Sequence, residues 1–405
     1  MSPRRDPVAR TPRGARRRTR EDREDREDRE DREDPGARAP RTADPLEKGD
    51  PMIVARMRST VELAEQHRLA AHWDGQGHRS FRCRVGRWTL VTFPDVVAGS
   101  PAGQEFVEAL RAVPGIESVV DSTESPPLAS LLATGEPSVV PVAGDRSVGG
   151  GGFTVIAGPC AVEDETQLMT LAREVRDHGA DLLRGGAFKP RTSPYAFQGL
   201  GGEGLRMLRE ASEATGLPVV TEVLDVAGVE AVAEVAHVLQ IGARNGQNFA
   251  LLREVALTGL PVLLKRGFGC TVEEWLHSAE YLLMAGNGHV VLCERGIRTF
   301  ENATRFTLDI SAVPLVKRIS HLPVVVDPSH ACGRSDLVEP LAAVAAAAGA
   351  DGVMVDVHHD ADAARCDGKQ AITPEEFGAL VHRTGRVLRG LDRPAPEAGR
   401  ALAAT

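Results

Sequence analysis

The sequence predicts an α/β protein: a (β/α)8 TIM barrel over residues 153–390, preceded by a small ferredoxin-like (βαββαβ) domain and a disordered N-terminal tail. Eight short apolar runs alternate with eight segments of helical periodicity in the barrel region, and this alternation is typical of buried parallel strands joined by helices. A polar or reactive residue follows each run, as expected where active sites form at the carboxyl ends of barrel strands. A doubly wound open sheet is the alternative, but no Gly-x-Gly-x-x-Gly follows the first run.

Composition excludes several classes of protein. The 405 residues are 42% hydrophobic and 26% charged with a net charge of −9, which are ordinary values for a globular chain. No apolar run is long enough to cross a membrane. The six cysteines form no Cys-x-x-Cys pair, so we expect free thiols and a cytoplasmic location. The net acidity beyond the tail argues against nucleic acid as a partner.

Residues 1–51 are dominated by charge, including five consecutive Arg-Glu-Asp triplets from Arg20 to Asp34. They contain no apolar stripe that could be buried, so we predict a disordered tail. A basic arm for an acidic partner and a translation start at Met52 are the alternatives.

A small domain is predicted over residues 52–122. Strand-like segments at 52–58, 81–85, 88–93 and 116–120, with helical segments at 60–71 and 103–113, give the βαββαβ order of a ferredoxin-like domain. It holds no acid–base or metal-ligating cluster, which favours a regulatory role. Residues 123–152 are predicted to be a linker and residues 391–405 a disordered tail.

The barrel region follows in order. Its strands are expected at 153–157, 181–184, 218–223, 238–241, 261–265, 290–293, 323–326 and 352–357. Its helices are expected at 163–178, 203–215, 226–236, 249–258, 272–285, 308–319, 336–348 and 374–388.

Four candidate metal ligands follow the first and the last two strands: Cys160, His330, Asp356 and Asp367. The first and last strands of a closed barrel are neighbours, so these side chains are expected to converge. One thiolate, one imidazole and two carboxylates suit Mn, Fe, Co or Zn better than Mg or Ca. His358 and His359 are competing ligands.

Seven cations are predicted at the same rim, which indicates anionic substrates carrying phosphate and carboxylate groups. They are Arg184, Lys189, Arg191, Arg244, Lys265, Arg295 and Arg298. Some are expected to pair instead with Glu222, Glu294 or Asp327. Lys265 and His330 are the candidates for proton transfer.

These motifs resemble those of 3-deoxy-D-arabino-heptulosonate 7-phosphate (DAHP) synthase, type I beta subgroup. The resemblance rests on Gly158-Pro159-Cys160, on the run from Leu183 to Ser193 with its Lys-Pro-Arg-Thr-Ser, on Gly242–Asn245, Leu264–Gly267 and Glu294–Phe300, and on Asp327-Pro328-Ser329-His330. The sister enzyme, 3-deoxy-D-manno-octulosonate 8-phosphate synthase, has Lys-Ala-Asn-Arg-Ser-Ser in place of Lys-Pro-Arg-Thr-Ser.

The resemblance implies condensation of phosphoenolpyruvate with erythrose 4-phosphate, the entry step of the shikimate pathway. A divalent ion at Cys160, His330, Asp356 and Asp367 would polarise the aldehyde, and Lys265, His330 and Cys160 are the implied catalytic residues. The implied substrate-binding residues are Arg184, Lys189, Pro190, Glu222, Arg244, Lys265, Arg295 and Asp327, with Arg191 and Thr192 for the phosphate of erythrose 4-phosphate. The family also implies a homotetramer and feedback by Tyr or Phe at the small domain.

The chain departs from the family at two positions. Asp356 stands where the family usually has Glu, and Cys366 stands where it commonly has Ser. The shorter carboxylate could weaken the metal site or bring in His359, and Cys366 could ligate the metal or oxidise with Cys160. A paralogue with weakened catalysis, acting in secondary metabolism or as a regulatory subunit, is therefore the alternative function.

Overall fold

The computed structural model describes residues 52–58, 60–122, 126–191 and 193–396. The predicted tail at 1–51 and residues 397–405 of the predicted tail at 391–405 lie outside the described residues, and so does Thr192. None of the described helices is long and apolar enough to cross a membrane.

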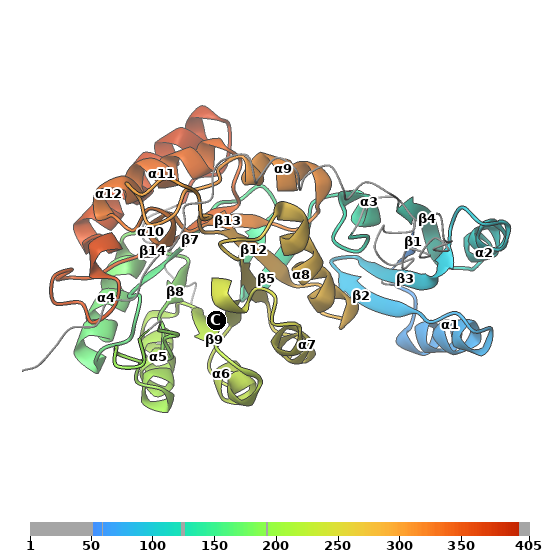
Figure 1. The fold of residues 1–405 in the computed structure, drawn as a ribbon, viewed down its shortest axis with the longest axis horizontal. Helices are drawn as coiled ribbons and strands as arrows, with labels where there is room; N and C mark the ends of the chain where they lie inside the picture. Colours follow the sequence, from blue (N-terminus) through green and yellow to red (C-terminus); the bar gives the residue numbers. More distant parts are fainter. Residues whose placement is uncertain (1–51, 59, 123–125, 192, 397–405) are drawn as a thin grey trace, which may run out of the picture. The chain divides into compact units, whose positions relative to one another are not determined.

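Eight parallel strands close into a barrel, which confirms the predicted fold class (Figure 1). They are β7 (Thr154–Gly158), β8 (Leu182–Arg184), β9 (Val219–Val223), β10 (Val238–Ile241), β11 (Val262–Lys265), β12 (Val290–Glu294), β13 (Val324–Val326) and β14 (Gly352–Asp356). Strand β14 pairs with β7 from Gly352↔Thr154 to Asp356↔Gly158, so the first and last strands are neighbours as expected. Every residue of these strands is buried, which explains why each reads as a continuous apolar run.

Helices cover the outside of the barrel. They are α4 (Glu165–Asp177), α5 (Gly202–Thr215), α6 (Val229–Ala233), α7 (Phe249–Leu257), α8 (Val272–Met284), α9 (Ala312–Ile319), α10 (Pro328–Cys332), α11 (Ser335–Ala347) and α12 (Pro374–Gly390). Short 3-10 turns lie at Val226–Gly228, Ala243–Asn245 and Gly368–Gln370.

Helix α10 was not predicted, and two of the predicted helices differ from the expectation. The segment at 226–236 divides into the 3-10 turn and the five-residue α6. Helix α9 begins at Ala312 rather than at 308, which places Pro314, with no N–H to donate, in the first turn, where proline is best tolerated.

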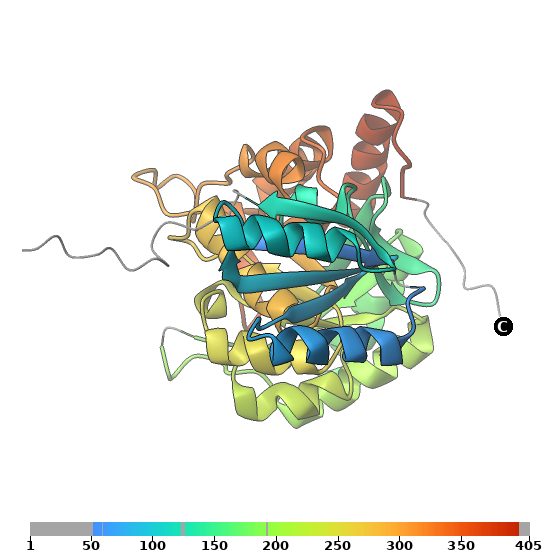
Figure 2. The same ribbon diagram turned by 90° about the vertical axis from the view of Figure 1, so that its right-hand side faces the viewer.

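The four-stranded antiparallel sheet has the order β2-β3-β1-β4. Its elements are β1 (Met52–Arg58), α1 (Leu63–Gly75), β2 (Phe81–Val85), β3 (Trp88–Val97), α2 (Pro101–Arg111) and β4 (Ile116–Ser122). Helices α1 and α2 lie across one face of this sheet (Figure 2). Trp73 and Phe106 from these helices pack there on Ile53 and Phe93 of the strands.

The opposite face of the sheet joins the hydrophobic core of the barrel. Val54, Cys83 and Leu90 belong to the same buried cluster as Leu128 and the barrel strands. Glu280 of α8 fixes the intervening chain, because its two carboxylate oxygens accept hydrogen bonds from the N–H groups of Leu128 and Ala129, each at 2.9 Å.

The segment predicted as a linker carries regular structure. It contains α3 (Leu131–Thr134) and an antiparallel hairpin of β5 (Val139–Ala143) and β6 (Arg146–Gly149). Val140 and Val148 of the hairpin pack against one layer of side chains inside the barrel, to which all eight strands contribute. The hairpin therefore fills the end of the barrel opposite the carboxyl ends of the strands.

Candidate functional site

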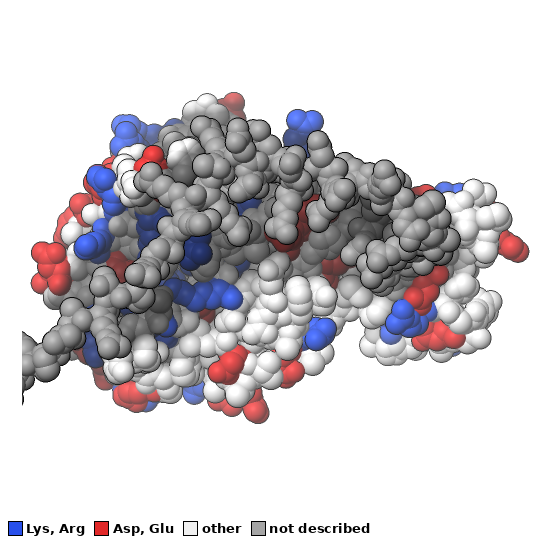
Figure 3. Space-filling view, in the orientation of Figure 1, with Lys and Arg blue, Asp and Glu red and all other residues white. Residues whose placement is uncertain are grey.

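The carboxyl ends of the barrel strands surround a cavity of about 480 Å³. Most of the predicted substrate-binding residues line it: Arg184, Lys189, Pro190, Arg191, Glu222, Arg244, Lys265 and Arg295. His330, Asp367 and Cys366 also line it. Lys and Arg side chains gather in the recessed part of this face (Figure 3).

Three of the four predicted metal ligands come together at the cavity wall. The Cys160 Sγ lies 3.8 Å from His330 Nε2 and 3.4 Å from Asp367 Oδ2. His330 Nε2 lies 3.7 Å from Asp367 Oδ2. Two ligand atoms on one tetrahedral ion are separated by about 3.3–3.8 Å, given metal–ligand bonds of about 2.0–2.3 Å. The three donors therefore fit a single divalent ion.

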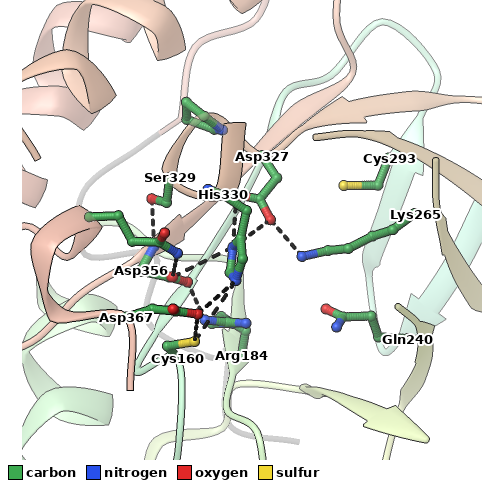
Figure 4. Close-up of polar contacts among 12 residues, drawn as sticks. Cys160, Arg184, Gln240, Lys265, Cys293, Asp327, Ser329, His330, Asp356 and Asp367 are labelled. Carbon is green, nitrogen blue, oxygen red and sulfur yellow. Dashed lines mark hydrogen bonds and ion pairs between the residues drawn. The ribbon is translucent and has the colours of Figure 1, made fainter. Parts of the chain in front are cut away.

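The ring of His330 is oriented by a carboxylate on its other side. His330 Nδ1 lies 3.0 Å from Asp327 Oδ2, and the Nε2 edge faces Cys160 and Asp367 (Figure 4). A metal-binding histidine usually has such a carboxylate partner, which fixes the ring and raises its basicity. Burial opposes the charged imidazole, but Asp327 and Asp356 outweigh burial and raise the pKa of His330.

Asp356 lies outside this cluster. Its Oδ1 pairs with Arg184, and its Oδ2 accepts a hydrogen bond of 2.6 Å from Gln370 Nε2. Both side chains of the ion pair are buried. The carboxylate of Asp356 is therefore already satisfied by two donors, and it approaches His330 only at Nδ1, at 3.5 Å.

The two competing histidines lie apart from the three donors. His359 bonds to Glu174 of α4 through Nε2 at 2.5 Å, and His358 lies 3.6 Å from Glu163.

Cys160 has a second thiol and a cation beside it. Its Sγ lies 3.7 Å from the Sγ of Cys366 and 3.1 Å from Lys189 Nζ. The contact with Cys366, together with burial, raises the pKa of Cys160, and the same contact lowers the pKa of Cys366. Arg191 Nη1 lies 2.5 Å from the Cys366 Sγ. The absence of a side chain at Gly186 leaves room for Lys189, because a Cβ on Gly186 would lie 2.6 Å from the Lys189 Cδ.

Some rim cations have acidic partners and others do not. Lys265 Nζ lies 2.5 Å from Asp327 Oδ2, and Arg184 pairs with Asp356. Within the part of the chain that the structure describes, no ion pair involves Arg244, Arg295 or Arg298. Their charges are thus available to an anion in the cavity.

The prediction missed four residues of the site. Arg305 Nη1 lies 3.0 Å from Gln370 Oε1 and 3.3 Å from Asp367 Oδ1. Arg305 thus contacts the carboxylate of Asp367, and Gln370 contacts that of Asp356. Phe268 and Phe306 also line the cavity. Only the positions of Phe268 and Phe306 in strand-end loops could have indicated these two residues, because a phenylalanine side chain does not by itself point to metal or anion binding.

Comparisons with known proteins give a consistent result. Residues 137–388 match the DAHP synthetase I family. The chain is 46% identical over 337 residues to a phospho-2-dehydro-3-deoxyheptonate aldolase of Thermotoga maritima, covering 83% of this chain and 95% of that protein. It is 32% identical over 256 residues to a 2-dehydro-3-deoxyphosphooctonate aldolase of Syntrophobacter fumaroxidans, covering 59% and 88%.

Two solved structures are similar as well. The crystal structure of the T. maritima phospho-2-dehydro-3-deoxyheptonate aldolase (DAHP synthase) has a TM-score of 0.67 and 41% identity, covering 85% of this chain and 99% of that one. A truncated form of 3-deoxy-D-arabino-heptulosonate 7-phosphate synthase from T. maritima has a TM-score of 0.63 and 49% identity, covering 66% and 98%.

Proposed function

This chain belongs to the DAHP synthetase I family, and from that premise we infer how its barrel mouth serves the reaction. The enzyme condenses phosphoenolpyruvate with erythrose 4-phosphate and water to give DAHP and phosphate, the first step of the shikimate pathway. The resemblance drawn from the motifs is thereby confirmed. No finding favours the alternative of a paralogue with weakened catalysis.

We propose that Cys160, His330 and Asp367 hold a divalent metal ion. The close approach of their three ligand atoms, all within 4.8 Å of one another, is the observation that carries this proposal. When bound, such an ion supplies Lewis acidity that polarises the aldehyde of erythrose 4-phosphate. The thiolate and imidazole ligands favour Mn, Fe, Co or Zn.

The cations divide into two groups around this site. Five of the cations that line the cavity are proposed to bind the phosphate and carboxylate of phosphoenolpyruvate: Arg184, Lys189, Arg244, Lys265 and Arg295. Arg191 is proposed to bind the phosphate of erythrose 4-phosphate, together with Pro190 and with Thr192 outside the described residues. Glu222, a buried acid that lines the same cavity, is proposed to contact the substrates on the opposite wall.

We propose Lys265 for proton transfer, because both ring nitrogens of His330 are engaged: Nδ1 faces Asp327, and Nε2 faces the other donors of the proposed metal site. Asp327 contacts both side chains, at 2.5 Å from Lys265 Nζ and 3.0 Å from His330 Nδ1, so it orients the two groups toward the cavity. Close opposite charges hold the pKa of Asp327 well below its usual range despite burial, which keeps it an acceptor for both.

Four further properties are proposals from the family. They are a regulatory role for residues 52–122, feedback by Tyr or Phe bound there, a homotetramer, and a cytoplasmic location.

Steady-state assay of DAHP formation tests the proposed function. The chain should turn over both substrates, lose activity after treatment with a chelator, and regain it with Mn or Co. Replacement of Cys160 by Ser should abolish the recovery and weaken binding of Co(II) in a titration. Full activity in the chelated protein would contradict the metal site but not the reaction.

A further inference from the structure

Arg295 differs from the other cations of the cavity in how it is held. Only 4% of its surface is exposed, and its Nη1 has no hydrogen-bond partner among the described residues. Burial is the main reason why the pKa of its guanidinium lies below the usual range. A buried cation without a carboxylate partner is costly, so something else must hold it in place.

Two aromatic rings lie against the guanidinium of Arg295. The Arg295 Cζ lies 4.2 Å from the ring centre of Phe306 and 5.7 Å from that of Phe268. The two rings stack on each other with their centres 5.4 Å apart and an interplanar angle of 17°. Arg298 lies over Phe268 on the same stack, at 5.0 Å.

The backbone next to Arg295 leaves room for the ring of Phe306. Gly296 follows Arg295 with a φ of 89°, and a Cβ on it would lie 2.7 Å from the Phe306 Cβ. Phe306 N–H also donates to the Ala331 carbonyl at 2.8 Å, which ties the ring to the helix that carries His330.

An aromatic face and a carboxylate hold an arginine differently. A carboxylate occupies the N–H donors of the guanidinium and cancels its charge. The face of a ring attracts the cation from above and leaves the donors at the guanidinium edge free. Asp327 is close enough to raise the pKa of Arg295, and Arg305 is close enough to oppose it. Without the ring, Arg295 could turn toward Asp327 and compete with Lys265 for it.

We propose that Phe306 is a positioning residue that keeps Arg295 unneutralised and aimed at an anionic group of the substrate. The ligand chemistry is a phosphate or carboxylate oxygen, and under the proposed function it belongs to phosphoenolpyruvate. Phe268 stacks on the ring of Phe306 and supports it from the side.

The test uses the full chain with Phe306→Leu, Phe306→Tyr and Phe300→Leu. The last is a matched control, because Phe300 lies in the same loop and is fully exposed. In Phe306→Leu, the KM for phosphoenolpyruvate and the calorimetric Kd for inorganic phosphate should each rise roughly 5- to 30-fold, with kcat nearly unchanged. Phe306→Tyr keeps a ring face and should restore both values, and Phe300→Leu should match the parent chain.

A double-mutant cycle separates positioning from general damage. In an Arg295→Ala background, Phe306→Leu should weaken phosphate binding no further, because its effect passes through Arg295. Additive losses, or an unchanged KM and Kd in Phe306→Leu, would overturn the inference. If the parent chain forms no DAHP but the phosphate titrations show this coupling, the proposed function fails and the role of Phe306 stands.

Discussion

Asp356 and Asp367 carry the same functional group at the same end of the barrel, yet their neighbours differ. Asp367 lies beside Cys160 and His330, whereas Asp356 is paired with Arg184 and accepts a hydrogen bond from Gln370. Both oxygens of Asp356 already accept from donors, so a metal ion would have to compete with these contacts. Stability is therefore expected to depend on Asp356, and metal affinity on Asp367.

Replacement of each aspartate by asparagine should separate these two roles. Asp367→Asn should lower the affinity for Co(II) or Mn(II) by tenfold or more, roughly the effect of disturbing one ligand. Asp356→Asn leaves the buried Arg184 without its partner and should lower the free energy of unfolding by about 3–5 kcal/mol. Metal titration and urea unfolding of the metal-free proteins measure the two effects. A larger loss of metal affinity in Asp356→Asn than in Asp367→Asn would show that Asp356 is a ligand after all.

Sequence reasoning located these residues but could not assign their partners. The strand-end positions follow from periodicity, because the carboxyl ends of parallel barrel strands share one rim. The pairing of Asp356 with Arg184 depends on side-chain packing between β14 and β8, which are far apart in the chain. The contact of Phe306 with Arg295 likewise depends on how a loop folds back, and no spacing rule reports that.

Among the elements, helix α8 of the barrel contacts the segment that follows the small antiparallel sheet. It begins with a capping box in which Thr271 and Glu274 satisfy each other's backbone groups, and it carries Glu280 inward to the chain at Leu128 and Ala129. The sequence predicted the helix from its periodicity. It could not show that an apparently ordinary helical glutamate is buried and bound to a segment rich in Ser, Pro, Gly and Ala.

Glu280 should make stability depend on pH. Burial raises its pKa from 4.5 to about 7, so between these values the folded state keeps a proton that the unfolded state has released. The free energy of unfolding should therefore fall by about 3 kcal/mol as the pH rises through this window, and this contribution should not change further above it.

Urea unfolding at several pH values between 4.5 and 8 measures this slope. Glu280→Gln should flatten the slope within the window, and Glu273→Gln, an exposed change on the same helix, should not. An equal slope in Glu280→Gln and the parent chain would contradict the assignment.

At the scale of the whole molecule, the small sheet and the barrel share one hydrophobic core. Trp88 and Leu90 of the sheet and Leu128 of the following segment are buried in the same cluster as the barrel strands. The order of the elements in both parts was predictable from periodicity. Their common core was not, because it requires knowing which face of the sheet each helix leaves uncovered.

Removal of residues 1–125 should leave a folded barrel with an apolar surface newly exposed around Leu128 and Ala129. The truncated T. maritima synthase, to which this barrel is similar, supports the expectation that the barrel folds. We expect a lower Tm and increased self-association in calorimetry and light scattering. A truncated chain that matches the full chain in both measurements would argue against the shared core.

The hairpin at the closed end of the barrel bears on how the molecule assembles. Val140 and Val148 meet side chains from Ile156 on the first barrel strand to Met354 on the last. The hairpin is made first as the chain is synthesised, but its binding surface is complete only when β14 has docked beside β7. A partly closed barrel therefore lacks part of this surface, so docking of the hairpin and closure of the barrel favour each other.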